Sequence, residues 1–347
     1  MYDYTVFIGR MQPPHIGHIK TIQKALELSD NVIIILGSAN KPSDIKNPWS
    51  WIHRQQMIRS CFNEQENKKI IIQPVEDRLY NNMYWIQMVQ QSVDITIRSK
   101  NHNLSETKVA LIGHHKDESS WYLDNFPTWK QIEMPNIKNI NATDIRKDYF
   151  GNMNYCIQFD DRLPKTVIKN LIEFQDSEKF DLLLEEKSFL EKHDEMWSKA
   201  PYTPTFNTTD AVVFRSGHIL LIERRNTPGK GLLALPGGYL NPEEAALDGA
   251  IRELIEETKL KGPGSEMLKD KVFADRVFDH PQRSLRGRII TKAYFFNLGQ
   301  GKLLKVKGAD DAAKANWYSL NEIAGMRHRI FEDHADIIEY GISKFPC

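Results

Sequence analysis

The first third of the chain alternates short, wholly apolar runs with amphipathic stretches, and this alternation limits the folds open to it. Four runs have the composition of buried strands: residues 4–8, 31–37, 69–75 and 108–113. Three stretches with helical spacing of apolar residues separate them: about residues 17–28, 51–62 and 82–92. Strands buried on both faces and separated by helices predict a doubly wound parallel sheet, with ligands at the carboxyl ends of its strands.

The pattern changes after residue 163. Residues 164–203 are helical and charged, and the Pro- and Thr-rich segment 198–210 is the best candidate for a linker. Short strands then predominate, including 272–278 and 288–297, with one strong helix at 242–258. A chain of 347 residues is long enough for two domains. We expect an α/β domain, a helical connector with a linker, and an α+β domain at residues 1–163, 164–203 and 204–347.

The composition excludes a general attraction to nucleic acid or to an anionic membrane. Lys plus Arg and Asp plus Glu each number 46, so any anion-binding site must be a local cluster. Cys61, Cys156 and Cys347 lack metal-ligand spacing, which is typical of a reducing compartment. The sequence has neither a signal-peptide pattern nor an apolar run long enough to cross a bilayer. We therefore expect a cytoplasmic protein.

The segment GRMQPPHIGH joins the first expected strand to the first expected helix. Gly9 and Gly17 would let a ligand approach the backbone, and the N–H groups of a helix N-terminus suit a phosphate. Arg10, His15 and His18 are the candidate donors to that phosphate. A simple capping turn and a metal site are the alternatives, and no third metal ligand lies nearby in the sequence.

Two motifs resemble those of the HxGH nucleotidyltransferase superfamily. HIGH at residues 15–18 matches the first, and Thr143-x-x-Arg146 in NATDIR matches the later S/T-x-x-R motif. The segments IILGSANKP, IKNPWSWIHR and VEDRLYNNMYW are similar to nicotinamide-mononucleotide adenylyltransferases of the archaeal type. The resemblance implies a Rossmann-like fold that forms NAD and pyrophosphate from ATP and nicotinamide mononucleotide, with Mg²⁺ (Mn²⁺ as the alternative) bridging the triphosphate.

The same resemblance implies how the phosphates are held. Arg10, His15, His18 and Arg146 would neutralise charge on the reacting phosphates. Thr143 would bond a phosphate oxygen or cap the helix that carries Arg146.

For the second substrate, the resemblance implies that Trp85 stacks on the nicotinamide ring, with core packing as the alternative role. Asn81 or Asn82 would bond the carboxamide, and Lys46 would hold the mononucleotide phosphate. Asp77 begins the same stretch and completes the candidate substrate contacts, together with the backbone at Gly9 and Gly17.

A second set of residues lies between 238 and 257. At about 100° per residue, the carboxylates of Glu253, Glu256 and Glu257 fall on one side of the expected helix. Clustered carboxylates repel one another unless cations lie among them, so they suit divalent metal ions. A solvated acidic helix face is the alternative.

Gly238, Glu244 and Arg252 precede these carboxylates at the spacing of the Nudix box, which the segment resembles. The resemblance implies an α/β/α sandwich and a Mg²⁺- or Mn²⁺-dependent diphosphatase in which Glu253, Glu256 and Glu257 hold metal and Glu253 and Glu257 serve catalysis. We expect Glu244 to act as a helix cap and a support. Asn241 would be the N-cap residue and Pro242 the first residue of that helix.

Lys259 departs from the box, which has glycine at this position. If the helix ended there, Lys259 would take a left-handed conformation, which costs a lysine about 1–2 kcal/mol. The alternative is that the helix continues to Gly262.

The segments PGKGLLALPGG and DHPQRSLRGRIIT resemble the Nudix half of bifunctional proteins that couple this adenylyltransferase to an ADP-ribose pyrophosphatase. Arg283, Arg286 and Arg288 would then contact the diphosphate or the terminal ribose, with a solvated basic strand edge as the alternative. Asp310 or Asp311 would offer a further carboxylate as general base.

The leading hypothesis is a bifunctional enzyme of NAD metabolism that also hydrolyses ADP-ribose to AMP and ribose 5-phosphate. The alternatives keep the adenylyltransferase and make the Nudix half a non-catalytic ADP-ribose or NAD sensor, or a hydrolase of another nucleoside diphosphate. A nucleic-acid-binding regulator is disfavoured by the neutral charge. The expected partners are small nucleotides (ATP, nicotinamide mononucleotide, NAD and ADP-ribose), and homo-oligomer formation stays open.

Overall fold

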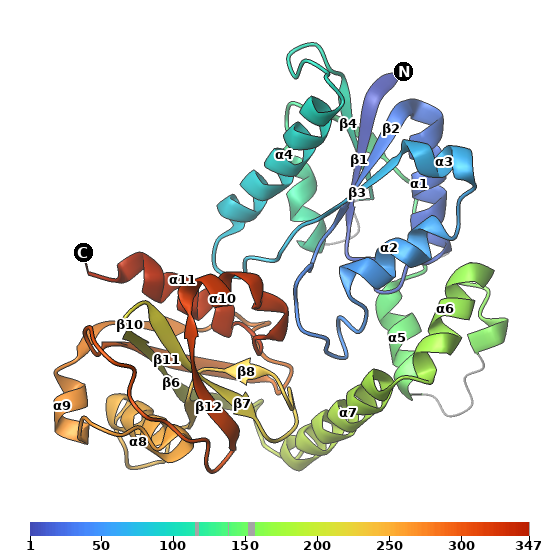
Figure 1. Ribbon diagram of the computed structural model, residues 1–347. Helices are drawn as coiled ribbons and strands as arrows, with labels where there is room; N and C mark the ends of the chain where they lie inside the picture. The colour runs from blue at the N-terminus through green and yellow to red at the C-terminus, as the bar shows by residue number, and fades with distance from the viewer. Residues whose placement is uncertain (115–117, 138, 152–156, 347) are drawn as a thin grey trace. The chain divides into compact units, whose positions relative to one another are not determined.

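The computed structural model describes residues 1–114, 118–137, 139–151 and 157–346. They group into two compact units, Met1–Leu184 and Glu185–Cys347 (Figure 1). Helix α7 (Glu178–Trp197) crosses the division, so the expected connector 164–203 is shared between the units. Among the described residues, no helix is both long and apolar enough to cross a membrane.

Five parallel strands form the sheet of the first unit in the order β3-β2-β1-β4-β5. Their bounds are β1 (Tyr2–Gly9), β2 (Ser29–Leu36), β3 (Ile70–Pro74), β4 (Val109–Gly113) and β5 (Lys130–Glu133). The predicted doubly wound parallel sheet is confirmed. Sequence reasoning missed β5 because its four residues, KQIE, are mostly polar and exposed at the edge of the sheet.

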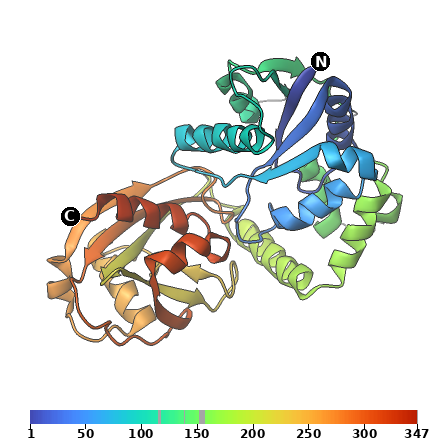
Figure 2. The ribbon, with the colours of Figure 1, turned by 45° about the horizontal axis from the view of Figure 1, so that its top comes forward.

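Helices cover both faces of this sheet (Figures 1 and 2). Phe7 and Ile34 point to the face covered by α1 (Ile16–Leu28) and α2 (Trp51–Arg59). Val6 and Ile33 point to the face covered by α4 (Asn82–Ser99). This alternation buries the central strands β1, β2 and β4 on both sides, as the wholly apolar runs predict.

The remaining helical segments of the first unit pack around α2 and the sheet edges. A separate apolar cluster joins α2 to α5 (Ala142–Gly151) and α6 (Lys165–Gln175) through Met57, Tyr149 and Leu171. Three short segments complete the unit: α3 (Glu64–Lys69), η1 (Glu118–Asn125) and η2 (Ile157–Phe159).

The second unit is built on a seven-stranded mixed sheet with the central order β10-β11-β6-β7-β12. Strand β9 pairs with β6, β8 pairs with β7, and β6 runs parallel to β11 while the other pairs are antiparallel. The bounds are β6 (Thr205–Arg215), β7 (His218–Arg224), β8 (Leu233–Ala234), β9 (Gly237–Tyr239), β10 (Val272–Phe278), β11 (Arg288–Asn297) and β12 (Ala312–Ser319).

A helix lies on each face of this second sheet. Ala250 and Leu254 of α8 (Ala246–Thr258) pack in one apolar cluster with Val213 of β6. On the other face, α11 (His334–Lys344) lies so close that a Cβ at Gly341 would meet the Phe295 side chain at 2.5 Å. The α/β/α arrangement therefore agrees with the expected Nudix architecture. Three short segments complete the unit: α9 (Ser265–Lys269), α10 (Leu320–Gly325) and η3 (Arg327–Arg329).

The structure corrects three local expectations. Strand β6 begins at Thr205, so only the start of the expected linker 198–210 is irregular. Helix α8 begins at Ala246 and not at Pro242, because residues 242–244 form a turn. The helix also ends at Thr258 and does not continue to Gly262, since Lys259 takes the left-handed conformation with φ 43° and ψ 38°.

Candidate active sites

The junction of β1 and α1 brings the two motif histidines together. Their rings are stacked with centroids 3.7 Å apart. The backbone N–H of His15 donates to His18 Nδ1 at 3.2 Å. A Cβ at Gly17 would lie 2.9 Å from His15 Cε1. Glycine is therefore required at this position by the His15 ring itself, whereas the sequence suggested only a ligand that approaches the backbone.

The hydrogen bond fixes how His18 can act. Because its Nδ1 accepts a backbone N–H, a neutral His18 carries its proton on Nε2, which is then a donor. Burial, and secondarily the neighbouring His15, lower the pKa of His18 well below its ordinary value. A neutral, oriented N–H donor at the start of a helix suits a phosphate oxygen.

The second motif lies beside the first. Arg146, 8% exposed, donates to the carbonyl of Gln12 at 2.5 Å and to the Thr143 hydroxyl at 3.3 Å. Asn141 Oδ1 accepts the Asp144 N–H at 2.9 Å, so Asn141 and not Thr143 caps the start of α5. Of the two roles expected for Thr143, the capping role is thus wrong.

Four cations converge near these motifs. Burial lowers the pKa of Lys46, Asp44 opposes the shift, and Arg10, Lys41 and Arg146 each lower this pKa further. Burial and Arg10 likewise lower the pKa of Arg146 to about 10. Like charges held this close are costly unless an anion lies among them. This is the local cluster that a protein with no net charge needs in order to bind phosphates.

A fully buried arginine that sequence reasoning missed supports this cluster. Arg54 on α2 is 0% exposed and donates to the carbonyls of Gly37 at 2.8 Å and Ser38 at 3.3 Å, and also to that of Arg10. It thereby ties together the loops that follow β1 and β2. Its pKa is lowered to about 10, chiefly by burial, so it remains charged at neutral pH. The partners of Arg54 are backbone atoms, which leave no signal in the sequence.

The start of α4 carries the residues expected to hold nicotinamide. Asn81 Oδ1 accepts the Tyr84 N–H at 3.0 Å as the helix cap, and Asn81 and Asn82 are both exposed. The half-buried Trp85 ring lies 5.7 Å from Trp121 and 5.9 Å from Tyr122, centroid to centroid.

Asp77, in the loop before α4, accepts both the N–H and the hydroxyl of Ser38, at 3.1 and 2.7 Å. It therefore holds the loop that follows β2 in addition to any contact with substrate. Sequence reasoning missed Trp121 and Tyr122 because they come from a different part of the chain.

In the second unit, Arg252 organises the residues of the box. It donates to Glu244 at 2.9 and 2.6 Å and to Glu253 and Glu256 at 2.9 Å each. Glu244 also accepts the Asn241 N–H at 2.8 Å, so the capping-box bond forms although the helix begins later. A Cβ at Gly238 would lie 2.5 Å from Glu253 Oε1, which explains the need for glycine there.

Glu257 is the most buried carboxylate of the box, at 3% exposed. Burial raises its pKa to about 8, and the charges of Glu253 and Asp311 add to this effect. The Gly237 N–H donates to its Oε2 at 3.0 Å. The charge of Asp310 also raises the pKa of Glu253. Asp310 and Asp311, the two aspartates suggested as a general base, therefore both lie near the box.

These carboxylates fit a divalent cation in chemistry, because oxygen ligands are what Mg²⁺ and Mn²⁺ take in proteins. A buried carboxylate repelled by its neighbours is stabilised when a cation binds among them. In the described part of the chain, the ligand atoms of Glu253, Glu256 and Glu257 are not gathered within 4.8 Å of one another. Arg252 holds two of them in this conformation.

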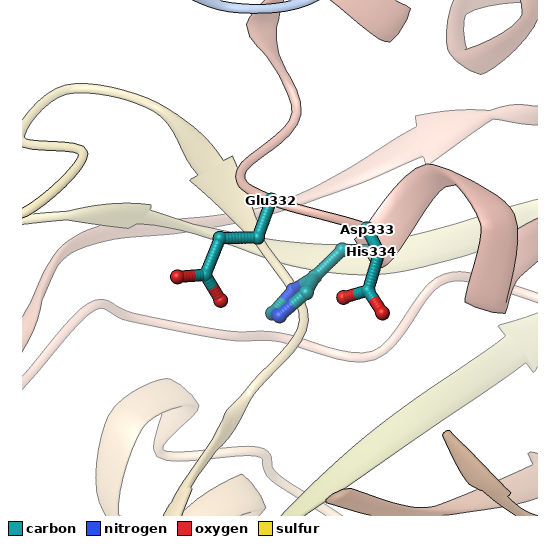
Figure 3. Close-up of side chains that lie close together, drawn as sticks. All are labelled: Glu332, Asp333 and His334. Carbon is teal, nitrogen blue, oxygen red and sulfur yellow. The ribbon is translucent and has the colours of Figure 1, made fainter. Parts of the chain in front are cut away.

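Glu332, Asp333 and His334 do place their ligand atoms within 4.8 Å of one another (Figure 3). Both Asp333 oxygens, however, accept from Arg283 at 2.9 and 2.8 Å, and His334 Nδ1 accepts the Leu235 N–H at 2.9 Å. The donors to these atoms are thus already present in the protein, and we interpret the trio as an internal hydrogen-bonding network rather than a metal site.

The basic residues after β10 separate into different environments. Arg283 is 4% exposed and its guanidinium is engaged by Asp333, which places it in the interior and not on a solvated strand edge. Arg286 lies 3.5 Å from Glu332 and 5.8 Å from the Phe331 ring, while Arg288 is paired loosely with Asp279 at 3.9 Å. Arg286 is therefore better placed for a ligand than Arg283.

Sequence reasoning missed Arg224. Its guanidinium lies 4.1 Å from the centroid of the Phe331 ring, which Arg286 also approaches. Burial is the main cause that lowers its pKa, followed by the nearby Arg286. Two guanidinium groups thus lie around one ring in the unit that carries the box.

The fold and the sites define a protein class: an HxGH nucleotidyltransferase unit joined to a Nudix unit. Residues 6–148 match the Cytidylyltransferase-like family and residues 204–340 match the NUDIX domain family. The first part is 41% identical over 178 residues to a nicotinamide/nicotinic acid mononucleotide adenylyltransferase of Acinetobacter baylyi, covering 51% of this chain and 89% of that protein.

The second part is 32% identical over 130 residues to an ADP-ribose pyrophosphatase of Methanocaldococcus jannaschii, covering 38% of this chain and 69% of that protein. A crystal structure of a bifunctional NMN adenylyltransferase/ADP ribose pyrophosphatase of Francisella tularensis, complexed with AMP and a manganese ion, covers 99% of both chains with 35% identity and a TM-score of 0.88. The chain belongs to the family of bifunctional NMN adenylyltransferases/ADP-ribose pyrophosphatases.

Proposed function

We propose that the first unit transfers AMP from ATP to nicotinamide mononucleotide and that the second hydrolyses ADP-ribose to AMP and ribose 5-phosphate. The observation that carries the first activity is the convergence of Arg10, Lys41, Lys46 and Arg146 beside the stacked histidines.

The adenylyl transfer requires alignment more than proton transfer. The attacking phosphate of nicotinamide mononucleotide is already an anion, so no general base is needed. His18, through Nε2–H, and the cations Arg10 and Arg146 would stabilise the charge that builds up at the α-phosphorus. Lys46 would hold the mononucleotide phosphate, and Mg²⁺, with Mn²⁺ as the alternative, would arrive bound to the triphosphate of ATP.

The nicotinamide would stack on Trp85. Because Asn81 Oδ1 is used as the cap of α4, we assign the carboxamide contact to Asn82. Thr143, which accepts from Arg146, would keep that guanidinium directed at the phosphates.

In the second unit, Glu253, Glu256 and Glu257 would hold the divalent ion, and a bound ion of this kind supplies an electrophile for the diphosphate and an activated water. Arg252 would keep Glu253 and Glu256 near each other until the ion binds. Arg286 would contact the diphosphate. Glu244 would act as a support, since its two oxygens are used by Arg252 and Asn241.

We place the enzyme in the cytoplasm, where its nucleotide substrates are found, and we assign the two activities to residues 1–163 and 204–347. The isolated thiol of Cys61 agrees with a reducing compartment.

Two substitutions test the assignment in one purified protein with two product assays. His18→Ala should abolish NAD formation from ATP and nicotinamide mononucleotide and leave ADP-ribose hydrolysis near the unmodified rate. Glu257→Gln should do the reverse, so the retained activity reports the amount of protein in each assay, and thermal unfolding reports whether the substituted unit is folded. Strong hydrolysis by Glu257→Gln would refute the metal role. If the unmodified protein bound ADP-ribose without hydrolysing it in Mg²⁺ or Mn²⁺, the second unit would be a sensor.

A further inference from the structure

The short segment Leu233–Gly237 connects β8 to β9 and determines where the Glu257 carboxylate lies. The Gly237 N–H donates to Glu257 Oε2 at 3.0 Å. Among the leading causes of the pKa shift of Glu257, this is the one hydrogen bond from the backbone of the described chain. If Gly237 moved, the Glu257 carboxylate would lose the hydrogen bond that it accepts from this backbone N–H. The position of the segment therefore matters for any cation that Glu257 binds.

Hydrogen bonds on two sides hold this segment. On the β6 side, the Ala211 N–H donates to the Pro236 carbonyl at 2.8 Å. A Cβ at Gly237 would lie 2.4 Å from the Thr209 carbonyl oxygen, so the backbone is in close contact there. On the other side, the Phe331 N–H donates to the Leu233 carbonyl at 2.8 Å.

His334 makes the remaining contact on that second side. Its Nδ1 accepts the Leu235 N–H at 2.9 Å, and its ring is 6% exposed. An Nδ1 that accepts must carry no proton, so the ring is neutral with its proton on Nε2. That Nε2 lies 3.9 Å from Asp210 Oδ1 on β6. The ring thus lies between the segment and the strand that supports it.

Its neighbours fix His334 in place. His334 is the first residue of α11, and the preceding Asp333 is 0% exposed and accepts two hydrogen bonds from Arg283. Figure 3 shows the three side chains Glu332, Asp333 and His334 leaving the start of this helix close together. Arg283 therefore anchors the helix N-terminus from which the imidazole reaches Leu235.

We propose that His334 is a positioning residue for the Nudix site, which holds Leu235 and, through residues 235–237, orients the Glu257 carboxylate for cation binding. The proposal rests on the proposed hydrolytic function of the second unit. It assigns His334 no contact with substrate or metal.

Three substitutions of His334 separate this role from others. Asparagine places an acceptor oxygen near the position of Nδ1, glutamine places one near Nε2, and leucine fills the space without an acceptor. His334→Leu and His334→Gln are expected to lower stability, because each leaves the buried Leu235 N–H without its acceptor. Only His334→Asn keeps the acceptor for the Leu235 N–H.

Three measurements on the full chain decide the question. Hydrogen exchange of the peptide spanning residues 233–239 in metal-free protein reports the Leu235 and Gly237 amides, and Mn²⁺ titration without nucleotide reports the cation site. His334→Leu and His334→Gln should exchange faster and bind Mn²⁺ about tenfold more weakly, the size typical of losing a group that orients a metal ligand. His334→Asn should stay near the unmodified protein in both. NAD formation should be unchanged in all three.

Two results would overturn the proposal. If His334→Asn bound Mn²⁺ as weakly as His334→Leu, the imidazole itself and not its acceptor would be required. If neither His334→Leu nor His334→Gln changed exchange or Mn²⁺ affinity, His334 would not position Glu257. Should His334→Leu fail to fold, the Asn and Gln variants still give the decisive comparison. Loss of the proposed hydrolytic function would appear separately, as no ADP-ribose hydrolysis by the unmodified protein.

Discussion

Lys259 offers a test in which the structure gives the size of the effect. It occupies the Nudix-box position where glycine is expected, and it adopts φ 43° and ψ 38° directly after α8. Its N–H donates to the Ile255 carbonyl at 2.9 Å, so the helix ends by the same hydrogen bond that a glycine would make. The side chain is exposed and makes no ion pair in the described structure.

The expected gain from Lys259→Gly follows from two opposing terms. The left-handed conformation costs a residue with a Cβ about 1–2 kcal/mol. Glycine loses about 0.5–1 kcal/mol more backbone entropy on folding than alanine. Relative to an uncharged residue that keeps its Cβ, the net stabilisation should therefore be about 0.5–1 kcal/mol, which for a unit of this size corresponds to a rise in Tm of about 1–4 °C.

Lys259→Ala is the matched control. Both variants lose the lysine charge near the helix C-terminus, an effect of about 0.3–1 kcal/mol, so this loss cancels in their comparison. The alanine variant keeps the Cβ and hence the backbone strain. We expect the glycine variant to be about 1 kcal/mol more stable than the alanine variant.

The assay is thermal unfolding of the full chain, together with the temperature at which each activity is lost. Loss of ADP-ribose hydrolysis should occur at a higher temperature in Lys259→Gly than in Lys259→Ala, and the temperature at which NAD formation is lost should not differ between them. Equal stabilities of the glycine and alanine variants would refute the account, because strain at the Cβ would then not be the cause. Hydrolysis itself should be unchanged, since no box carboxylate is altered.

Three further substitutions test other parts of the two sites. Gly238→Ala should lower ADP-ribose hydrolysis at least tenfold with little unfolding, because the added Cβ would lie 2.5 Å from Glu253 Oε1. Gly264→Ala is the control and should behave as the unmodified protein, since the space around Gly264 is open. Arg54→Lys should lower the free energy of unfolding of the first unit by about 2–3 kcal/mol and slow NAD formation, because the single nitrogen of a lysine cannot reach the Gly37, Ser38 and Arg10 carbonyls that Arg54 contacts through Nη1 and Nη2. Arg59→Lys on the same helix is the control. Equal effects of the two substitutions would argue against this role of Arg54. Trp85→Ala should raise KM for nicotinamide mononucleotide about tenfold and Trp85→Phe less, as expected for ring stacking, while an unchanged KM in both would mean that Trp85 serves only packing.

Much of the architecture could be predicted because the signals were local. The strands 272–278 and 288–297 were predicted with the bounds that the structure shows, since apolar residues and turn residues delimit them clearly. The start of α8 was wrong for an instructive reason. The Asn241 N–H does donate to the Glu244 carboxylate as expected, but Glu244 also accepts from Arg252, and the helix begins only at Ala246. Tertiary contacts thus override a correct local signal.

The candidate sites show the same limit. Motif spacing located the histidines and the box carboxylates, because ligands and metal ions impose fixed spacing on a single helix or loop. It did not locate Arg54 or His334, whose hydrogen-bond partners are backbone groups far away in the sequence. Arg283 was suggested as a contact for the diphosphate or the terminal ribose, with a solvated strand edge as the alternative, and it lies in the interior paired with Asp333, 50 residues away in the sequence. Such pairings are invisible until the chain is folded.

The zero net charge of the chain conceals two opposite local fields, and this contrast explains how one protein can handle phosphates in two ways. In the first unit, lysine and arginine side chains lower one another's pKa, so the protein itself supplies the positive charge for a triphosphate. In the second unit, burial raises the pKa of Glu253 and Glu257 and neighbouring carboxylates add to the rise, which favours a bound cation there. The first field is set by residues that are always present. The second depends on the orientation of Glu257, which is why the hydrogen bonds that hold Gly237 deserve to be tested before the carboxylates themselves are exchanged.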